Sequence, residues 1–402
     1  MSSRYDVCII GAGLVGLSVG RALAEAYPGI SQVILEKEDD VATHQSGHNS
    51  GVVHSGLYYR PGSLKARLCV EGRLELARFC EEQGVPFRQA GKLVIATKPS
   101  EIEALEELHR RGAKNGLTGL RRLDSTEIKE LEPAAAGVAA LHVPEAGVVD
   151  FPMMARALAA GLRATGAEVL TGRRVEAISF GSGGVRIRTA DQEIRASVAV
   201  NCAGLHTDRV AAMAGVVSDI QIVPFRGEYY TLTDEAAGLV KSLIYPVPDP
   251  RFPFLGVHFT RRIDDTVEVG PNAVLALGRE HYRGSRPDWS DVREVLGWRG
   301  FRKLASRQLW AGSSEFIRSR SKTMYSRSAR SLLPAVRRHH LITGGAGVRA
   351  QAVASDGRLV DEFVIEEAGP TVHVLNAPSP GATSSLAIGR HIAGLVSRHL
   401  TG

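Results

Sequence analysis

Short hydrophobic runs alternate with glycine-rich and polar segments at the start of the chain. Residues 5–10 form a mostly apolar, β-branched run that is typical of a buried strand. Three spaced glycines follow, and residues 17–27 then carry apolar side chains at helical spacing. A second short apolar run covers residues 33–36. The chain therefore opens with a strand–turn–helix–strand unit, which predicts a parallel α/β sheet.

The rest of the chain mixes helical and strand patterns. Helices are predicted over residues 64–83, with Ser63 as N-cap, and over residues 101–112, 151–165, 290–309, 315–333 and 384–400. Strands are predicted over residues 167–170, 185–188, 193–195, 199–203 and 341–343, with a β-rich region at residues 224–266. Because strands occur near both ends of the chain, we expect one sheet to combine distant segments. The predicted fold class is α/β, or α+β overall, with a discontinuous Rossmann-like domain and a β-sheet substrate-binding domain.

Composition and charge narrow the class of protein. Among 402 residues, 23% are charged and 44% hydrophobic, which excludes a wholly disordered chain. The 49 Lys and Arg and 43 Asp and Glu leave a net charge of +6, a mild value that predicts no nucleic-acid partner. Glycine, at 43 residues, is in excess without a collagen-like period, so it is expected in turns and close backbone approaches.

The four cysteines show no metal-ligand spacing, and no metal site is predicted. They are Cys8, Cys69, Cys80 and Cys202. Cys69 and Cys80 lie in one predicted helix, about 16 Å apart along its axis, which is too far for a disulfide. A reduced, cytoplasmic setting follows. No apolar stretch is long enough to predict a membrane-spanning helix.

The densest basic stretch lies between residues 318 and 338. It contains Arg318, Arg320, Lys322, Arg327, Arg330, Arg337 and Arg338. Serines and apolar residues interleave these charges, so an exposed helix face is one interpretation. Peripheral contact with an anionic surface, such as the inner membrane, is the alternative.

Residues 11–16 form a G-x-G-x-x-G motif between the first predicted strand and helix. They read Gly11, Ala12, Gly13, Leu14, Val15 and Gly16. In this motif the glycines permit the turn, let a pyrophosphate approach the backbone, and let helix and strand pack closely. The helix N-terminus offers N–H groups to the phosphates. Glu36 follows 20 residues after Gly16, where its carboxylate can accept hydrogen bonds from ribose hydroxyls. We therefore predict a dinucleotide cofactor.

The surrounding sequence favours a flavin dinucleotide. No contiguous second βαβαβ half follows the first unit, as an NAD domain would need. Instead, residues 43–56 are polar and glycine-rich, and can wrap a large cofactor. The second half of the site would then come from Ala203 and Gly204 and from the C-terminal part of the chain, as in flavoproteins.

Several longer strings point to a family. They are residues 47–59 (GHNSGVVHSGLYY), 61–66 (PGSLKA), 224–229 (PFRGEY), 254–261 (FLGVHFTR), 270–275 (GPNAVL), 346–351 (AGVRAQ) and 376–384 (NAPSPGATS). On these strings the chain resembles the FAD-dependent oxidoreductases of the D-amino-acid-oxidase-like class, and within it the L-2-hydroxyglutarate oxidases and dehydrogenases. The strings run from one end of the chain to the other, whereas the G-x-G-x-x-G motif alone marks only the superfamily. A small departure is Gly381, where alanine is expected.

The resemblance implies noncovalent FAD and oxidation of a small 2-hydroxy dicarboxylate at C2 to the 2-oxo acid, by hydride transfer to flavin N5. It implies an FAD-binding domain of residues 1–85, 140–222 and 338–402 under a substrate domain of residues 86–139 and 223–337. Besides residues 11–16 and Glu36, the residues expected at FAD are Lys37, Gln45, Ser46, Asn49, Ser50, Gly51, Val175, Ala203, Gly204, Gly347, Gly381, Ala382 and Thr383.

Histidine suits the proton transfer, because a base with a pKa near 7 can take the C2 hydroxyl proton. His54, in the glycine-flanked loop where the resemblance puts the flavin ring, is the first candidate. His258, in the substrate-domain region, is the second candidate and is also expected to contact substrate. A structural hydrogen bond within the loop is the alternative role for His54.

A dicarboxylate requires two cationic or multi-donor sites, and the planar fork of arginine suits a carboxylate. Arg349 is the first candidate, placed after a glycine run at the end of a predicted strand. Arg226 and Arg261 are further candidates, although arginines in sheets commonly pair with acids such as Glu228 or Asp264. The remaining candidates for substrate contact are Tyr230, Tyr245 and Ser384, and a core position is the alternative for the two tyrosines.

The last predicted helix has an expected role of its own. If the resemblance holds, its N-terminal amides face flavin N1 and C2=O, where the positive end of the helix dipole stabilises the anion formed on reduction. An ordinary Ser/Thr-capped helix is the compatible alternative.

Three functions stay open on the sequence alone. The first is oxidation of L-2-hydroxyglutarate, with electrons passing to oxygen, a quinone or a carrier. The second is a related flavoenzyme acting on another 2-hydroxy acid, on glycerol 3-phosphate, or on an amine such as glycine or sarcosine. The third is a flavin-binding protein without turnover.

Overall fold

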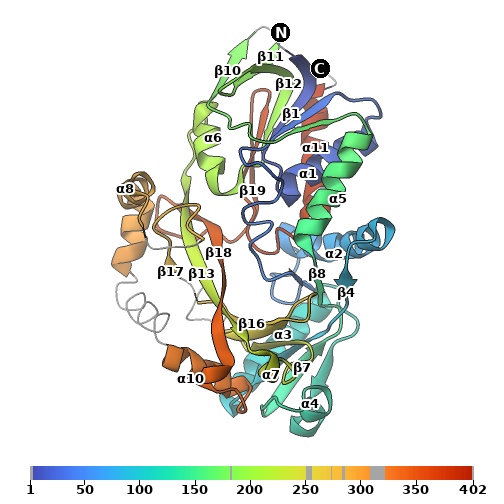
Figure 1. Cartoon of the computed structure of the whole chain (residues 1–402), viewed down its shortest axis with the longest axis vertical. Coiled ribbons are helices and arrows are strands. Elements are labelled where there is room, and N and C mark those ends of the chain that lie inside the picture. The colour runs from blue at the N-terminus through green and yellow to red at the C-terminus, as the bar shows by residue number, and fades with distance from the viewer. Residues whose placement is uncertain are drawn as a thin grey trace.

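A parallel sheet joins strands from both ends of the chain. The computed structural model describes residues 3–181, 183–249, 256–272, 274–282, 286–307 and 322–400. At the centre of the sheet, β1 (Ser3–Ile10) pairs in parallel with β2 (Gln32–Leu35) and β12 (Glu193–Asn201). Beyond these, β9 (Glu168–Leu170) pairs with β2, and β20 (Thr371–Asn376) pairs with β12. The expected sheet of distant segments is therefore present (Figure 1).

Both faces of this sheet are buried, which explains the continuous apolar runs. Val7 and Ile9 of β1 face a core with the helices, whereas Cys8 and Ile10 belong to a second core on the opposite face. The helices of the first core are α1 (Leu14–Ala26), α2 (Leu64–Gln83), α5 (Phe151–Ala164) and α11 (Ser385–Leu400). The antiparallel additions to the sheet are β10 (Ala177–Gly181), β11 (Gly184–Arg188) and β19 (Val364–Ala368).

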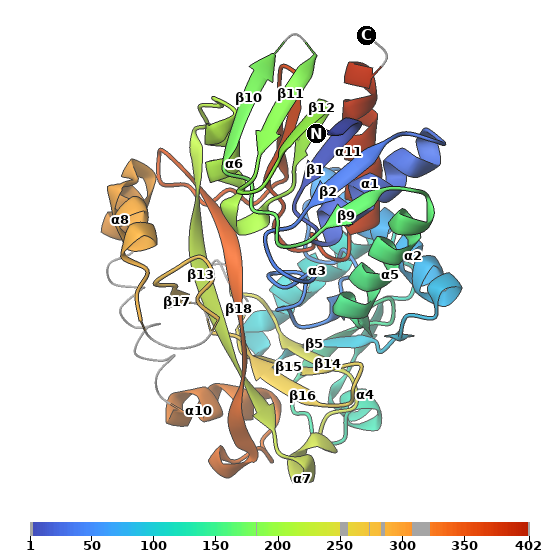
Figure 2. The same ribbon diagram turned by 45° about the horizontal axis from the view of Figure 1, so that its top comes forward.

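A second, mostly antiparallel sheet lies at the other end of the molecule (Figure 2). Its strands are β17 (Val274–Leu275), β13 (Ile220–Leu232), β16 (Val267–Gly270), β15 (His258–Arg261), β14 (Leu243–Pro246), β5 (Lys92–Ala96), β7 (Ala139–Val143) and β6 (Arg121–Leu123), in this order, with β18 (Leu341–Ala354) also on β13. A small third sheet holds β3 (Val52–Val53), β8 (Gly147–Val149) and β4 (Phe87–Arg88). Strands β13 and β18 extend from beside α6 to the far end of the molecule by α10 (Figure 1). The predicted domain bounds stay a prediction.

Shorter helices surround the two large sheets. They are α3 (Ile102–Lys114), α4 (Ser125–Leu131), α6 (Thr207–Met213), α7 (Asp234–Ala237), α8 (Trp289–Gly297) and α10 (Lys322–Leu332), with the 3₁₀ turns η1 (Pro99–Glu101), η2 (Gly204–His206) and η3 (Arg338–His340). Among the described residues, none of the helices combines the length and the hydropathy that a membrane span requires. All four cysteines are free thiols, as predicted.

Most predicted elements are confirmed, and the differences have physical causes. The strand predicted at residues 341–343 continues as β18 to Ala354, because pairing with β13 along this length outweighs the poor strand propensity of its glycines. Gly344 fits there because a Cβ would lie 2.9 Å from the Tyr229 carbonyl oxygen. The helix predicted at residues 290–309 is interrupted at Trp298, after which residues 299–307 are helical again. Residues 308–321, with Arg318 and Arg320, lie outside the described residues.

The crossing of α1 and α11 depends on a glycine. A Cβ at Gly389 would lie 2.4 Å from the Ser18 carbonyl oxygen, whereas a Cβ at Gly394, also in α11, would meet nothing within 4 Å. We predict that Gly389→Ala destabilises the protein by about 1–3 kcal/mol through overpacking. Gly394→Ala should stabilise it by up to about 1 kcal/mol through helix propensity. Thermal unfolding of both variants checks this, and equal melting temperatures would contradict the close packing.

Candidate active site

The turn between β1 and α1 has the geometry of a dinucleotide-binding turn. Gly11 has a φ of +106°, and a Cβ there would lie 2.5 Å from the Cys202 carbonyl oxygen. A Cβ at Gly16 would lie 2.0 Å from the Gly11 carbonyl oxygen, so helix and strand pack as closely as the motif requires. Gly13 is the N-cap of α1 and has no side-chain capping bond, which leaves the positive end of the helix dipole for an anion.

Glu36 lies beside this turn, directly after β2. Its side chain is buried, with Oε2 accepting a hydrogen bond from the Ala12 N–H at 2.9 Å and Oε1 accepting from the Glu38 N–H at 3.1 Å. A carboxylate has further lone pairs for donors such as ribose hydroxyls. The Arg173 N–H donates to the Glu36 carbonyl oxygen at 2.7 Å, which brings the segment with Val175 close to the same place.

The polar loop after Glu36 packs against the glycine turn and β18. The Leu14 N–H donates to Ser46 Oγ at 3.0 Å. A Cβ at Gly204 would lie 3.1 Å from Gln45 Oε1, and one at Gly347 would lie 2.6 Å from the His48 carbonyl oxygen. Segments predicted from distant parts of the chain to hold FAD thus meet along this loop.

The other predicted FAD residues lie around the same loop. Asn49 braces it, donating to the Ser46 carbonyl oxygen at 2.8 Å and accepting from the Gly51 N–H at 2.8 Å, with Ser50 between them. Ala203 follows β12, and its N–H donates to Asn201 Oδ1 at 3.1 Å. The turn of residues 381–383, with Gly381, Ala382 and Thr383, leads into α11. The glycine turn at the start of α1, the buried acid and the close glycines fit FAD.

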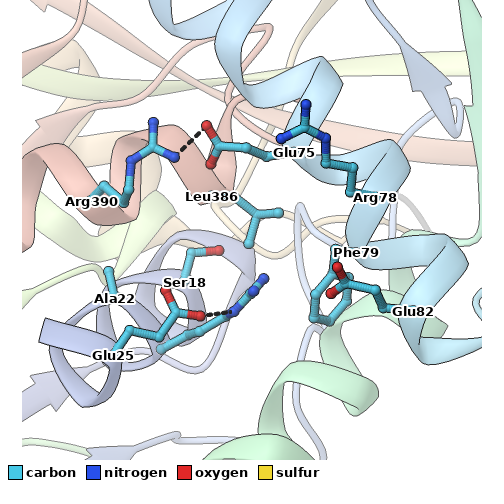
Figure 3. A pocket seen from close by; sticks show the side chains of 10 residues that line it. Ser18, Ala22, Glu25, Glu75, Arg78, Phe79, Glu82, Leu386 and Arg390 are labelled. Carbon is cyan, nitrogen blue, oxygen red and sulfur yellow. Dashed lines mark hydrogen bonds and ion pairs between the residues drawn. The ribbon is translucent and has the colours of Figure 1, made fainter. Parts of the chain in front are cut away.

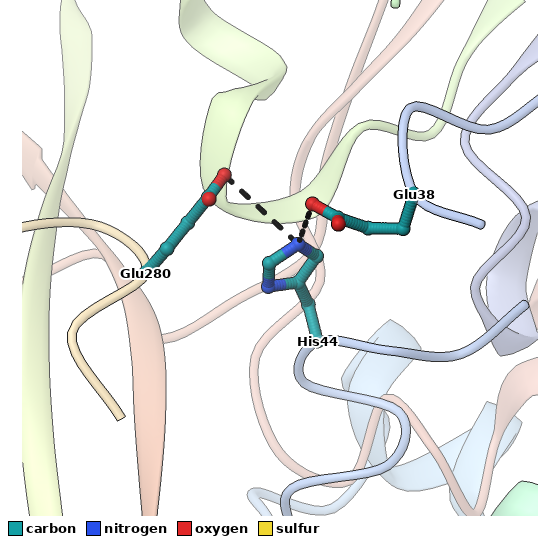
Figure 4. A group of neighbouring side chains, drawn as sticks. All are labelled: Glu38, His44 and Glu280. Carbon is teal, nitrogen blue, oxygen red and sulfur yellow. Dashed lines mark hydrogen bonds and ion pairs between the residues drawn. The ribbon is translucent and has the colours of Figure 1, made fainter. Parts of the chain in front are cut away.

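Lys37 belongs to a cluster of charged side chains at the start of the loop. The side chains of Glu38, His44 and Glu280 lie close enough to suggest a metal site (Figure 4). However, Lys37 Nζ forms ion pairs with Glu38 and, at 2.7 Å, with Glu280, so an ammonium group already supplies the positive charge. His206 adds a hydrogen bond to Glu280 at 2.7 Å and, with Lys37, holds the Glu280 pKa well below its usual range. That the protein has no metal site stays a prediction.

His54 lies at the junction of the loop and the start of α11. Its backbone N–H donates to Thr383 Oγ1 at 3.0 Å, and its Nε2 lies 3.3 Å from Ser379 Oγ. Within the described residues, its buried Nδ1 has no hydrogen-bond partner. Burial, and then the positive charges of Lys92 and Arg349, hold the pKa of His54 well below its usual value. The imidazole is therefore neutral near pH 7 and able to accept a proton.

His258 lies on β15 and is also neutral. Its Nδ1 lies 2.8 Å from the Gly256 carbonyl oxygen, which only accepts, so Nδ1 carries the proton and Nε2 keeps its lone pair. Its ring stacks on Tyr245 with centroids 4.0 Å apart. Burial, opposed by the hydrogen bond to Gly256 and assisted by the charges of Lys92 and Arg349, lowers the His258 pKa to about 3.

Arg349 lies inside β18 rather than at the end of a strand, which corrects the sequence-based placement. It is opposite Phe225 of β13, and its side chain shares a hydrogen bond with Tyr229. Its charge acts on both His54 and His258. The structure thus brings the first-choice histidines and arginine to one place, together with Tyr229, which the sequence did not single out. An irregular register between Glu228 and Tyr230 hides Tyr229 from a simple alternation of faces.

The other predicted substrate contacts point elsewhere. Arg226 pairs with Glu228, and Arg261 pairs with Asp265 at 3.0 Å, so both form the ion pairs that were the alternative, the latter with a different acid. Tyr230 packs edge-on against Tyr325, with ring centroids 4.8 Å apart, beside a separate core. Ser384 is fully buried under α2, where a Cβ at Gly72 would lie 2.7 Å from its Cα.

Strand register explains this division. Thr260 is opposite Leu243 of β14 and Glu268 of β16, and Leu243 is in turn opposite Lys92 of β5. Residues two apart on a strand share a face, so His258 and Tyr245 belong to the face of Lys92. Arg261 and Tyr230 belong to the opposite face. Sequence reasoning missed Lys92, whose only signal is a lysine that begins an otherwise apolar strand.

A surface pocket of about 200 Å³ lies apart from these residues, between α1, α2 and α11 (Figure 3). Ion pairs line it: Arg21 with Glu25 at 2.7 Å, and Arg390 with Glu75. It includes none of the predicted site residues.

The Glu36 carboxylate allows a test of the cofactor site. We predict that Glu36→Gln weakens FAD binding about 10-fold or more, because charge-assisted hydrogen bonds to the ribose are lost. Flavin content after dialysis and FAD titration of the apoprotein measure this. Asp39→Asn, at an exposed acid three residues later, is the control and should retain FAD. Equal FAD affinities for both variants would exclude a ribose contact by Glu36.

The comparisons with known proteins agree with this geometry. The DAO family model, described as FAD dependent oxidoreductase, matches residues 6–395. An L-2-hydroxyglutarate dehydrogenase from Indibacter alkaliphilus is 49% identical over 386 residues, which cover 96% of this chain and 97% of that protein. The human mitochondrial L-2-hydroxyglutarate dehydrogenase is 42% identical, covering 98% of this chain and 88% of that protein. The Escherichia coli K12 protein of that name is 42% identical, with coverage of 98% and 93%.

Solved structures show the same fold. An L-α-glycerophosphate oxidase from Mycoplasma pneumoniae with FAD bound has a TM-score of 0.79 at 22% identity, covering 100% of this chain and 95% of that one. A glycine oxidase from Geobacillus kaustophilus has a TM-score of 0.75 at 20% identity, with coverage of 99% and 95%. The predicted fold class is confirmed, and the chain belongs to the DAO family of FAD-dependent oxidoreductases, with FAD as its cofactor.

Proposed function

We propose that the protein oxidises the C2 hydroxyl of L-2-hydroxyglutarate to give 2-oxoglutarate. Relatives of that activity, 42–49% identical over almost the whole chain, support the substrate. The structural observation that carries the proposal is the meeting of two neutral histidines with two cationic side chains, Lys92 and Arg349. This combination suits an anionic substrate that must lose a proton.

His54 is the proposed base. When bound, FAD supplies the acceptor for the C2 hydride at N5. His54 takes the C2 hydroxyl proton, which it can do because burial and neighbouring cations keep its imidazole neutral. A bound carboxylate offsets those cations and strengthens His54 as a base. His258, with Nε2 unprotonated, lies in the same surroundings and is the second candidate for accepting this proton.

Arg349 is the proposed ligand of the carboxylate next to C2. Its guanidinium offers paired N–H donors, and the Tyr229 hydrogen bond fixes its direction. The turn before α11 lies beside His54 through the Thr383 bond. The positive end of the α11 dipole there favours negative charge on the reduced cofactor.

The reaction needs an electron acceptor, which we propose to be oxygen, a quinone or a carrier protein. Basic side chains of α10 and the segment after it line a cavity of about 420 Å³; among them are Arg327, Arg330, Arg337 and Arg338. Such a surface attracts anionic partners. Peripheral contact with a membrane surface, in an otherwise cytoplasmic protein, is the corresponding proposal.

Turnover with a panel of substrates tests the function. The FAD-loaded protein, assayed with an artificial electron acceptor, should oxidise L-2-hydroxyglutarate and release 2-oxoglutarate in equal amount. Glycine, sarcosine and glycerol 3-phosphate should be poor substrates, because none carries a second carboxylate for the second cation. Preferred turnover of one of them would support the related flavoenzyme activity, and no turnover with any would support a flavin-binding role.

A further inference from the structure

Lys92 is a buried lysine whose charge has no counter-charge among the described residues. It begins β5 and is 1% exposed. Within the part of the chain that the structure describes, no carboxylate lies within ion-pair distance of its ammonium group. Burial lowers its pKa to about 8, so it remains mostly protonated at neutral pH. A buried charge without a partner is costly, and such groups cluster at functional sites.

Two acids that act on other residues of this region already have cations of their own. Glu268, on the same face of the sheet, forms an ion pair with Arg262 at 2.7 Å. Asp361 forms one with Lys65 at 2.6 Å. Burial raises the pKa of the Cys69 thiol to about 12, so this nearby group stays neutral. None of these groups neutralises Lys92.

Two tyrosines form the walls around the ammonium group. Lys92 Nζ lies 4.3 Å from the ring centroid of Tyr245 and 5.3 Å from that of Tyr58. The Tyr245 hydroxyl shares a hydrogen bond with Thr260. By contrast, the Tyr58 hydroxyl is buried and has no partner among the described residues. An ammonium group and an unused hydroxyl donor therefore stand together, which is the donor set that a carboxylate needs.

This donor pair belongs to the active site. The Lys92 charge acts on both His54 and His258, and His258 stacks on Tyr245. Arg349 acts on the same two histidines. The two histidines thus lie near two separate positive groups.

We propose that Lys92 and the Tyr58 hydroxyl bind the distal carboxylate of a 2-hydroxy dicarboxylate whose C1 carboxylate is held by Arg349. Lys92 is then the residue that selects dicarboxylates over monocarboxylates of equal chain length. The inference rests on the proposed function, and it replaces Arg226 and Arg261 as the second cationic site.

Lys92→Met tests this, because methionine keeps the length and removes the charge. With L-2-hydroxyglutarate, kcat/KM should fall about 10- to 100-fold, as for loss of a charge-assisted hydrogen bond. With L-2-hydroxypentanoate, which has a methyl group in place of the distal carboxylate, it should change by less than about 3-fold. Calorimetry should show the same pattern in binding: the affinity for L-2-hydroxyglutarate should fall, and the affinity for L-2-hydroxypentanoate should not change. Tyr58→Phe should also lower kcat/KM for L-2-hydroxyglutarate, but by a smaller factor.

Lys65→Met is the matched control, since Lys65 is also a buried lysine near His54 but is paired with Asp361. It should leave the ratio of the two substrates unchanged. The assignment would be overturned if Lys92→Met lowered kcat/KM equally for both substrates, or if it left the affinity for L-2-hydroxyglutarate unchanged. If Lys92→Met loses its flavin or does not fold, the ratio of kcat/KM for the two substrates in Tyr58→Phe tests the assignment instead. Wild-type protein that oxidises neither substrate would instead refute the proposed function.

Discussion

The candidate active site depends on two positive charges, those of Lys92 and Arg349, that lie near two neutral, buried histidines. Burial lowers the pKa of both His54 and His258, and the charges of Lys92 and Arg349 add to this effect, so both imidazoles are uncharged. A protein interior does not readily keep such charge uncompensated. In the proposed function, a dianionic substrate would resolve this, since each carboxylate would meet a cation and its arrival would raise the basicity of the histidine that takes the proton. Binding and proton transfer are therefore linked through one electrostatic arrangement.

The register of the second sheet decides which side chains join this arrangement. Lys92, Tyr245 and His258 come from three strands, yet their pairing places them on one face. On the opposite face, Tyr230 packs beside a core that includes Phe259 and Tyr325. At the turn between β1 and α1, where the cofactor is expected, close contacts between backbone atoms determine the geometry instead. Gly11 and Gly16 permit approaches that no side chain allows.

Much of this was predictable from the sequence, because local patterns carry it. The glycine turn, Glu36 and the helix from residue 64 follow from short motifs and periodicity, whereas His54 follows from the family resemblance of its loop. What the sequence did not reveal concerns long-range pairing. In the register of β13, Arg226 and Tyr230 lie away from Arg349. Tyr229 lies beside Arg349 because the register shifts between Glu228 and Tyr230, and no local sequence pattern shows this irregularity. Lys92 could not be found because its burial depends on β14 and β15, which are more than 140 residues away in the chain.

The central claim is that the site recognises a 2-hydroxy acid through two carboxylates. Anaerobic titration of the FAD-loaded protein, followed by the visible absorbance of the flavin, tests it most directly. The account predicts stoichiometric bleaching by L-2-hydroxyglutarate and little bleaching by L-2-hydroxypentanoate at the same concentration. Bleaching of equal rate and extent by both compounds would contradict it.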